Sequence, residues 1–434
     1  MNFNLLKHIR ENDDYTVVWL FNIGIEKFWN GEVFTVKNQN DDIIVNHMEE
    51  MNILITQEQD ILILRDNPNE DYLNTLKNLG FKIPNIVCPE IKDESKSISE
   101  ILLEDKALIS KIKALINKND NAVLVPYGVS FLEENIAKQL DINLFGSSHE
   151  INKSINNKVF SRNFSLDHSF RVPKGRICKG FSELEKASKE MLEKYETIII
   201  KEPCGASGKG LWVVRSLPKL KSTLLIIKRF FGDNIDNEWL VEEWCNKKSD
   251  LNYQIYVGDD GYIEMFSIKE QIVDGTVYVG SRIPPVIPTE TIEECKKCAE
   301  IIGKELYKYG YRGILGVDSM ILSTGELIPI VEINGRFTLS TYISFINFRL
   351  NKKTENVFAF YKRITLNDSR DFSEVKKQLK DDGLWYDDKG VFIYTSKTID
   401  SKYLNNYGRL FAICLSNDDD ELMNLYNKCN NLIN

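Results

Sequence analysis

The first 150 residues alternate short apolar runs with segments of helical periodicity, and this alternation restricts the fold more than any other feature of the sequence. Short apolar runs bounded by polar or turn residues are typical of buried strands, and a helix between two strands allows them to run parallel. The predicted strands are TVVWLFN, NILITQ, ILILRD, IPNIVCP and AVLVPYG, and the clearest predicted helices span residues 99–117 and 131–140. The alternation therefore predicts a parallel α/β layer.

The rest of the chain predicts at least two further units, because 434 residues exceed what one hydrophobic core usually serves. A polar connection at residues 146–157 ends the first unit, and residues 239–279 are rich in predicted strands with a turn at GDDG. An amphipathic helix is predicted over residues 289–309. After about residue 355 a helix, two strands and a final helix over residues 420–432 follow. We therefore predict domains at residues 1–150, 151–354 and 355–434, the last a small α+β cap.

Composition excludes several classes of function. The net charge is −9, and no run of Lys and Arg is long enough to follow a nucleic-acid backbone. No stretch of about 18 apolar residues predicts a membrane span, so we expect a cytoplasmic protein. The eight cysteines are scattered, which favours reduced thiols, and the pair Cys295 and Cys298 lies on the amphipathic helix without a second pair or a histidine partner. We assign none of the four histidines a catalytic role.

A β-branched run ends at Lys201 and leads into a glycine-rich loop and a second β-run, IIIKEPCGASGKGLWVV. Small residues let backbone amides approach phosphate oxygens, and Ser207 and Lys209 add a donor and a charge. The spacing differs from GxxxxGK[ST], and a strand instead of a helix follows, so the loop is not a P-loop. A phosphate-binding hairpin loop is one interpretation, and a hairpin tip whose lysines face water is the other.

A second pattern, GVDSMIL followed by a turn and LIPIVEINGR, brings acids and an amide onto neighbouring strands. Glu332 and Asn334 share a strand face because side chains alternate with period two, and Asp318 lies on the adjacent strand. Oxygen ligands of this kind suit Mg²⁺, which takes one or two carboxylates together with nucleotide phosphates. Arg336 would continue the same face and bind a phosphoryl group or an acid. The alternative is an exposed strand face with a surface ion pair.

The order of these residues resembles the ATP-grasp superfamily over roughly residues 120–345. The order is Lys158, Lys201 with its glycine loop, VEEWC, Asp318 and EINGR. The resemblance implies an ATP-grasp fold of the α/β and α+β classes, with an N-terminal parallel α/β pre-ATP-grasp domain and a small C-terminal α+β segment. It also implies that ATP lies between two α+β subdomains.

The resemblance assigns roles to individual residues. The nucleotide phosphates would be contacted by Lys158 and Lys201, with the loop of Gly205, Ser207, Gly208, Lys209 and Gly210 closing over them. The segment with Glu242, Glu243 and Cys245 would offer backbone groups to adenine, and Asp250 would contact the ribose. The metal ligands would be Asp318, Glu332 and Asn334, and Arg336 would steady the acyl phosphate. In D-alanyl-D-alanine ligases an arginine stands just before the residue that matches Asp318, and this sequence has none there. Lys269, Arg282 or Arg312 would supply the positive charge instead. Many relatives carry Pro or Ala where Gly335 stands, a difference expected to matter little.

The resemblance implies an ATP-dependent ligase that activates a carboxylate as an acyl phosphate, joins it to an amine and releases ADP and phosphate. The expected cofactors are ATP and two Mg²⁺ ions, with Mn²⁺ as an alternative. The sequence is most similar to peptide-forming carboxylate-amine ligases of the pheganomycin type and to acyl-carrier ligases of aminoglycoside pathways. Expected partners are small acids and amines, amino acids or a carrier protein among them, and a second copy of the chain. The alternatives are ligation to a carrier thiol or amine, phosphotransfer without ligation, and a non-catalytic ATP-binding module.

Overall fold

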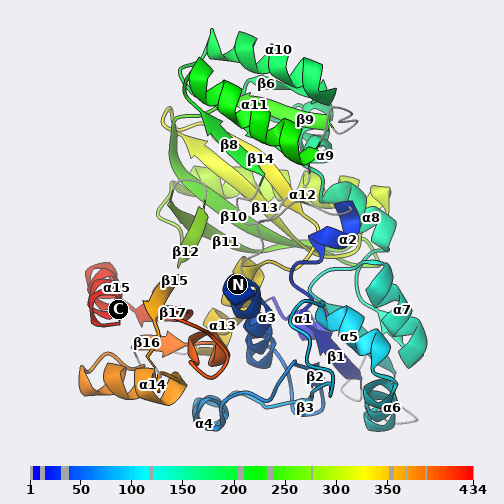
Figure 1. Cartoon of the computed structure of the whole chain (residues 1–434), viewed down its shortest axis with the longest axis vertical. Helices are drawn as coiled ribbons and strands as arrows, with labels where there is room; N and C mark the ends of the chain where they lie inside the picture. The colour runs from blue at the N-terminus through cyan, green and yellow to red at the C-terminus, as the bar shows by residue number, and fades with distance from the viewer. Residues whose placement is uncertain are drawn as a thin grey trace.

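The computed structural model of the chain describes residues 3–9, 15–30, 39–116, 121–203, 210–231, 238–274, 277–350, 356–367, 369–386 and 389–433. These residues form three β-sheets of five, eight and four strands with helices around them (Figure 1). Among the described helices, none combines the length and the apolar character needed to cross a membrane.

The N-terminal sheet is parallel, with strand order β3-β2-β1-β4-β5, which confirms the predicted α/β layer. Its strands are β1 (Thr16–Leu20), β2 (Ile61–Ile63), β3 (Asn85–Val87), β4 (Ala122–Pro126) and β5 (Asn143–Leu144). Its helices are α1 (Leu5–Ile9), α2 (Glu26–Asn30), α3 (Gln39–His47), α4 (Glu70–Asn78), α5 (Ile98–Glu104), α6 (Lys106–Leu115) and α7 (Phe131–Leu140). Apolar residues of α5, α6 and α7 cover one face of this sheet.

Two local predictions in this domain are wrong. The first half of the segment predicted as the strand NILITQ lies in η1 (Met48–Leu54), a 3-10 helix whose seven residues are all buried, and the second half forms no strand. A fully buried apolar run has no periodicity that separates a strand from a helical turn. The single helix predicted over residues 99–117 is divided at Asp105, whose carboxylate caps α6 by accepting the backbone N–H of Leu108 at 2.9 Å.

The central sheet is antiparallel, with order β14-β13-β10-β11-β12-β15-β17-β16. Its strands are β10 (Lys247–Val257), β11 (Ile263–Asp274), β12 (Val277–Ile283), β13 (Gly313–Leu322), β14 (Leu327–Asn334), β15 (Asn356–Thr365), β16 (Gly390–Ile393) and β17 (Tyr407–Ser416). Helix α12 (Thr289–Tyr309) has the predicted bounds and packs its buried stripe on β10 and β11. The C-terminal strands extend this sheet, because β15 pairs with β12.

The other elements of the C-terminal segment and the link to it are helical. They are α13 (Leu339–Leu350), α14 (Phe372–Asp381), η2 (Lys397–Ile399) and α15 (Asp419–Leu432). The final helix, α15, begins at Asp419, one residue before its predicted start at residue 420. The domain boundaries at residues 150/151 and 354/355 stay predictions.

The third sheet is small and antiparallel, with order β6-β9-β7-β8. Its strands are β6 (Gly175–Lys179), β7 (Ile198–Lys201), β8 (Leu211–Val214) and β9 (Glu238–Glu243). Helices α10 (Gly180–Leu192) and α11 (Leu217–Phe231) pack on it, and α8 (His149–Ile155) and α9 (Lys158–Asp167) lead into it. We call residues 175–243 the four-stranded subdomain. It lies at the far end of the molecule from α4, α14 and the N-terminal sheet (Figure 1).

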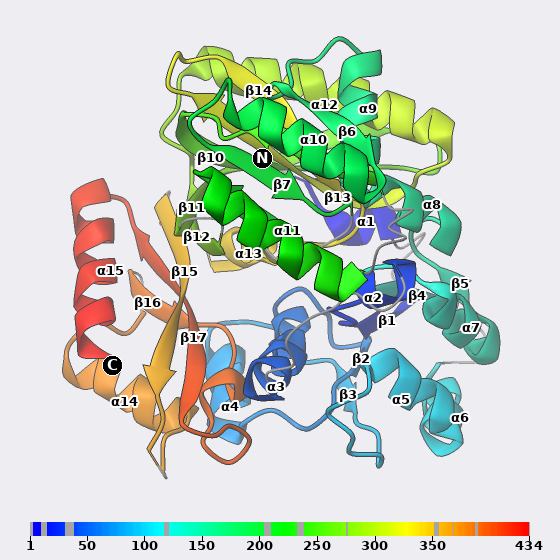
Figure 2. The same cartoon turned by 45° about the horizontal axis from the view of Figure 1, so that its top comes forward.

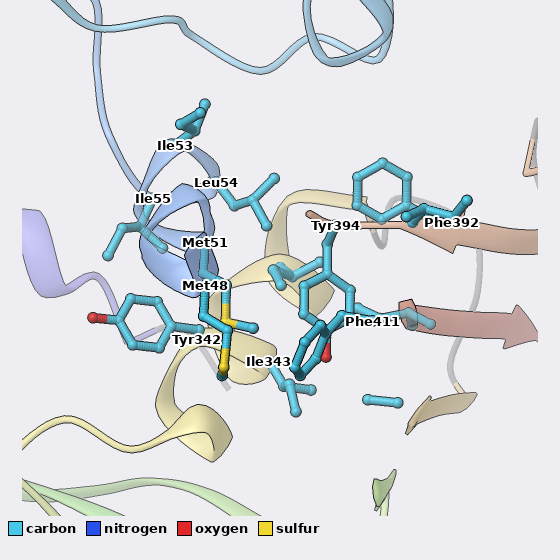
Figure 3. Packing of buried hydrophobic residues seen from close by; sticks show 14 of the residues in the cluster. Met48, Met51, Ile53, Leu54, Ile55, Tyr342, Ile343, Phe392, Tyr394 and Phe411 are labelled. Carbon is cyan, nitrogen blue, oxygen red and sulfur yellow. The ribbon is translucent and has the colours of Figure 1, made fainter. Parts of the chain in front are cut away.

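One hydrophobic core, which we call the large core, joins the N-terminal domain, α13 and the C-terminal strands. Figure 3 shows where they meet: Met51 of η1, Tyr342 and Ile343 of α13, and Phe392 and Phe411 of the C-terminal strands lie together. The four-stranded subdomain has a separate small core of β6 to β9, α10 and α11. Two further clusters lie beneath α12 on the central sheet and beneath α5 to α7 on the N-terminal sheet. Both of these sheets also contribute to the large core, so the molecule has a large body and one small unit, the four-stranded subdomain, whose sheet contributes only to its own core.

Candidate active site

Acidic and amide side chains form a row across the central sheet. Asp318 on β13 stands opposite Glu332 on β14 and, on its other side, opposite Asn252 on β10. Directly opposed residues of an antiparallel pair point to the same face of a sheet. The alternate residues Leu251 and Tyr253 pack in the core with α12, so the row lies on the face opposite that helix. The structure thus brings together the two predicted carboxylate ligands.

Asp318 is held by three amide groups. Its Oδ1 accepts from Asn252 Nδ2 at 2.9 Å and from Gln271 Nε2 at 3.0 Å, and its Oδ2 accepts from Asn334 Nδ2 at 3.0 Å. Burial, followed by the nearby charge of Glu332, raises the pKa of Asp318 to about 6, while the three hydrogen bonds oppose that shift. A cation beside both carboxylates would remove the repulsion between them.

The donor set here fits Mg²⁺ bound together with a substrate. No cluster of three or more His, Cys, Asp or Glu side chains that could hold a metal occurs in the described part of the chain. The row supplies two carboxylates and the amide of Asn334, all hard oxygen donors. Mg²⁺ binds through one or two carboxylates plus phosphate oxygens and waters, so two carboxylates suffice.

Lys158 connects helix α9 to this row. It is the first residue of α9, and its Nζ lies 2.9 Å from Glu332 Oε1. Its backbone N–H donates to the carbonyl of Pro203 at 2.7 Å, two residues after the end of β7. Lys158 therefore lies where the four-stranded subdomain meets the central sheet, with its side chain 95% buried.

A second ion cluster joins the four-stranded subdomain to helix α9. Glu242 on β9 accepts Lys201 Nζ at 2.6 Å, and its other carboxylate oxygen accepts Arg162 Nη1. All three side chains are at least 90% buried. The prediction assigned Glu242 a backbone contact with adenine, whereas its side chain here neutralises two cations. The sequence analysis missed Arg162, although its position four residues after Lys158 places it on the same face of a helix.

Of the predicted glycine loop, Gly205, Ser207, Gly208 and Lys209 lie outside the described residues. Gly210 is described and has φ +75°, a left-handed conformation that favours glycine. A Cβ at Gly210 would lie 2.7 Å from Glu202 Oε2, so close approach also requires glycine. Burial raises the pKa of Glu202 to about 7, and the nearby charge of Lys158 opposes this. Glu202 is a second site residue that the sequence analysis missed.

The predicted adenine segment forms the link from β9 to β10, and therefore from the small sheet to the central one. Glu243 Oε1 accepts the backbone N–H of Lys174 at 2.8 Å, which fixes the start of the link. Burial raises the pKa of the Cys245 thiol to about 11, so this cysteine is protonated at neutral pH. Asp250, predicted to contact the ribose, forms an ion pair with Lys247.

Arg336 does not continue the strand face as predicted. Strand β14 ends at Asn334, whose carbonyl accepts the backbone N–H of Arg336 at 2.8 Å. The buried guanidinium turns to the N-terminal domain, where it donates to the Tyr127 hydroxyl at 3.0 Å and pairs with Glu26 at 2.9 Å. Its Nε is buried without a hydrogen-bond partner in the structure as described.

The contact region of Arg336 lies beside the point where the strand order of the parallel sheet reverses. Strands β2 and β3 lie on one side of β1, and β4 and β5 on the other. Asn22 after β1 and Gly128 after β4 bond to each other, with Asn22 Nδ2 donating to the Gly128 carbonyl at 2.9 Å. In open α/β sheets, ligands bind outside the carboxyl ends of the strands at such a reversal.

The three cations considered in place of an arginine before Asp318 lie in different surroundings. Lys269 is in register with Asn252 in the row, but it is fully buried and donates to Ser344 Oγ at 2.6 Å. Burial holds its pKa well below the ordinary value, which favours the neutral amine.

Arg282 lies in register with Glu270, on the opposite face, and pairs with Asp419. Arg312 donates to the carbonyls of Tyr307 and Tyr311 at the end of α12.

Two family models match the chain. One described as Pre ATP-grasp domain matches residues 48–142, and one described as ATP-grasp domain matches residues 155–340. The chain therefore contains a Pre ATP-grasp domain and an ATP-grasp domain. These matches confirm the recognised family and the predicted fold class, and the second covers the four-stranded sheet and strands β10 to β14 of the central sheet.

Two curated ATP-grasp relatives carry the names of ligases. The [butirosin acyl-carrier protein]–L-glutamate ligase of Niallia circulans is 24% identical over 419 residues, which are 94% of this chain and 92% of that enzyme. The phosphoribosylamine–glycine ligase of Caldanaerobacter subterraneus is 28% identical over 246 residues, 53% of this chain and 57% of that enzyme. The similarity to the first relative therefore spans all three regions of the fold.

Solved ATP-grasp structures share the whole architecture at low identity. N5-carboxyaminoimidazole ribonucleotide synthetase in complex with ADP has a TM-score of 0.58 at 14% identity, with 96% of each chain covered. The biotin carboxylase domain of Hydrogenobacter thermophilus 2-oxoglutarate carboxylase, solved with MgADP and bicarbonate, has a TM-score of 0.57 at 12% identity, with 93% of this chain and 86% of that one covered. At these identities the likeness establishes the fold alone.

Proposed function

We propose that this protein is an ATP-dependent ligase that converts a carboxylate into an acyl phosphate and joins it to an amine, with release of ADP and phosphate. One observation carries the proposal. Asp318 and Glu332 stand side by side, and Lys158 Nζ lies 2.9 Å from Glu332 Oε1, where the four-stranded subdomain meets the central sheet. The names of the two ligase relatives support the same class of reaction.

In this proposal, side chains that pair with each other in the structure would contact Mg²⁺-ATP instead when it binds. Lys158 would leave Glu332 for a phosphate oxygen, and Glu332, Asp318 and Asn334 would hold the metal ion. Lys201 adds a second cation near the phosphates while Glu242 keeps it in place. Bound Mg²⁺ supplies charge neutralisation on the phosphates. The buried setting strengthens each of these electrostatic contacts.

The reaction itself balances without a further reagent. A carboxylate oxygen attacks the γ-phosphorus of ATP, the bond to the β-phosphate oxygen breaks, and ADP leaves. The amine then attacks the acyl carbon, loses a proton and expels phosphate. We place the acid or the amine beside Arg336, because its guanidinium extends from the end of β14 to the strand reversal of the N-terminal sheet.

The test is an ADP-release assay with pairs of amino acids, small acids and carrier-bound acceptors. With the correct acid and no amine, hydroxylamine should capture a hydroxamate, and ¹⁸O from labelled acid should appear in phosphate. ADP formed without labelled phosphate would instead favour phosphotransfer without ligation. AMP as the stoichiometric product would refute the mechanism, and nucleotide binding without any turnover would favour a non-catalytic binding module.

Further parts of the proposal concern stoichiometry and surroundings. We propose two Mg²⁺ ions, replaceable by Mn²⁺, a cytoplasmic location and a homodimer. Metal titration by calorimetry would give the ion number, and sedimentation would give the assembly state. One ion per chain would refute the two-ion proposal, and a monomer at all concentrations would refute the homodimer. Neither result would affect the ligase assignment.

A further inference from the structure

The outer surface of α11 combines positive charge with exposed apolar side chains. The helix contains four cations and no acid, in a chain whose net charge is −9. The exposed cations are Lys219, Lys221, Lys228 and Arg229. Eleven large apolar side chains are exposed in the described residues, and four of them lie on this one helix: Leu217, Leu225, Ile226 and Phe230. We call these eight side chains the α11 surface.

Within the described residues, packing accounts for the inner side of α11 but leaves Leu225 and Ile226 exposed on its outer side, while Lys228 Nζ lies 5.8 Å from the centre of the Phe181 ring. Leu220, Leu224 and Ile227 on the inner side of the helix already fill the small core with β6 to β9 and α10. Leu225 on the outer side is 68% exposed, the largest value among the exposed apolar side chains described. Exposed apolar groups gathered among like charges are typical of an interaction surface.

Building on the proposed ligase function, we infer that the α11 surface docks an acidic carrier protein that presents the acceptor or the acid. An acidic partner is repelled by most of a protein with net charge −9, so a local basic helix orients its approach. Apolar side chains between the cations then provide the contact area. The relative whose alignment covers 94% of this chain is named for an acyl-carrier protein, which supports this class of partner.

The position of α11 suits such a role. It follows β8 after two residues, and β8 pairs with β7, whose last residue is Lys201. A carrier protein on α11 would therefore contact the subdomain that carries the proposed phosphate-binding cations. Figure 2 shows α11 beside α10 on the four-stranded subdomain.

A membrane surface fits the α11 surface less well than a protein does. Insertion into a bilayer interface needs apolar residues in one stripe with a polar face opposite. Leu225 and Ile226 are consecutive and therefore point about 100° apart around the helix. The stripe of α11 that is continuous, formed by Leu220, Leu224 and Ile227, is buried in the small core.

The test measures binding of the holo form of the butirosin acyl-carrier protein, without ATP, to three forms of the full chain. These are the unchanged protein, the variant Lys221→Glu/Leu225→Ser, and the control Lys297→Glu/Ile301→Ser. The control pair has the same spacing on exposed positions of α12. We expect the α11 variant to weaken binding about tenfold and the control to change it less than twofold, with weaker binding of all forms at high salt.

Equal affinity of both variants, or no binding by the unchanged protein, would overturn the inference. Binding to phosphatidylglycerol vesicles but not to the carrier would indicate a membrane surface instead. A dimer that only the α11 variant disrupts, again without carrier binding, would indicate a second copy of the chain. Circular dichroism and Mg²⁺-ATP affinity show whether each variant is folded. Carrier binding that persists while no substrate pair yields ADP would refute the proposed function but not the docking surface.

Discussion

The central sheet and the four-stranded subdomain both contribute to the candidate site, but they are anchored very differently. Asp318 is fixed by amides from three strands of one eight-stranded sheet, whose C-terminal strands share the large core with the N-terminal domain. Lys201 and Glu242 belong to a sheet with its own small core. Between the two sheets the chain passes through the short link at Cys245.

The difference indicates a division of roles. A carboxylate row that is hydrogen-bonded on both sides keeps its geometry, as metal-binding groups need. A small unit with a separate interior can move as a body about its links, as enzyme lids do. We therefore expect the carboxylates to determine the chemistry and the subdomain to control access and closure. The following predictions test this division.

Changing Glu332 to Gln removes one carboxylate from the fixed row while preserving its shape. We expect the rate of ADP formation to fall on the order of 1000-fold, as for the loss of one group that stabilises transition-state charge. Stopped assays for ADP measure it, with Glu326→Gln at the exposed β13–β14 turn as the matched control. A loss of less than tenfold would show that the row does not carry the chemistry.

Truncating a buried isoleucine in each core tests whether the two units are separate. Ile227 in the small core and Ile346 in the large core are both fully buried. Each change to Ala should cost about 3 kcal/mol, from lost burial and the cavity left behind. Hydrogen exchange should accelerate only within residues 175–243 for Ile227→Ala, but across both ends of the chain for Ile346→Ala. Equal acceleration everywhere in both variants would contradict the division.

Gly335→Ala tests how rigidly the large body holds the end of β14. A Cβ at Gly335 would lie 2.1 Å from Cδ1 and 2.6 Å from Cγ1 of Ile155, which is fully buried. We expect a loss of about 2 kcal/mol, as for overpacking of a core. In an Ile155→Ala background the same change should cost less, and urea unfolding of the four proteins gives the coupling. Equal costs in both backgrounds would mean that the clash with Ile155 does not cause the loss of stability.

The pH dependence of Mg²⁺ binding should report on the fixed row. Asp318 binds a metal as the carboxylate, and this form is lost as pH falls through its pKa of about 6. The Mg²⁺ affinity should therefore drop about tenfold for each pH unit below 6, because one proton competes with the metal. Calorimetry from pH 5 to pH 8 measures it. Asp318→Asn should abolish this dependence and Glu202→Gln should preserve it, and the opposite pattern would assign the effect to the subdomain.

Much of the fold could be predicted because the relevant patterns are local. Strand alternation predicted the parallel sheet, and spacings of three and four gave the bounds of α12. The family and the fold class predicted from the ordered motifs are confirmed by the two family models. The ligase activity predicted with them agrees with the names of the relatives.

Other features depend on contacts between distant segments, which local patterns do not encode. The partners of Arg336 are Glu26 and Tyr127, about 310 and 209 positions away in sequence. Nothing near Arg336 in the sequence indicates that it turns to the N-terminal domain. The buried neutral state favoured for Lys269 likewise results from its coverage by α13. The roles of all the predicted site residues stay predictions until the variants above are measured.

The composition of the large core also determines when the protein can finish folding during synthesis. Its members range from Phe3 to Ile433, so ribosomes must release almost the entire chain before the core is complete. Until then the edge of β12 that later pairs with β15 is open to other strands, a situation that favours chaperone binding or aggregation. The small core lies within residues 178–241 and can close as soon as that continuous stretch emerges. The proposed lid would therefore be folded before the body on which it closes.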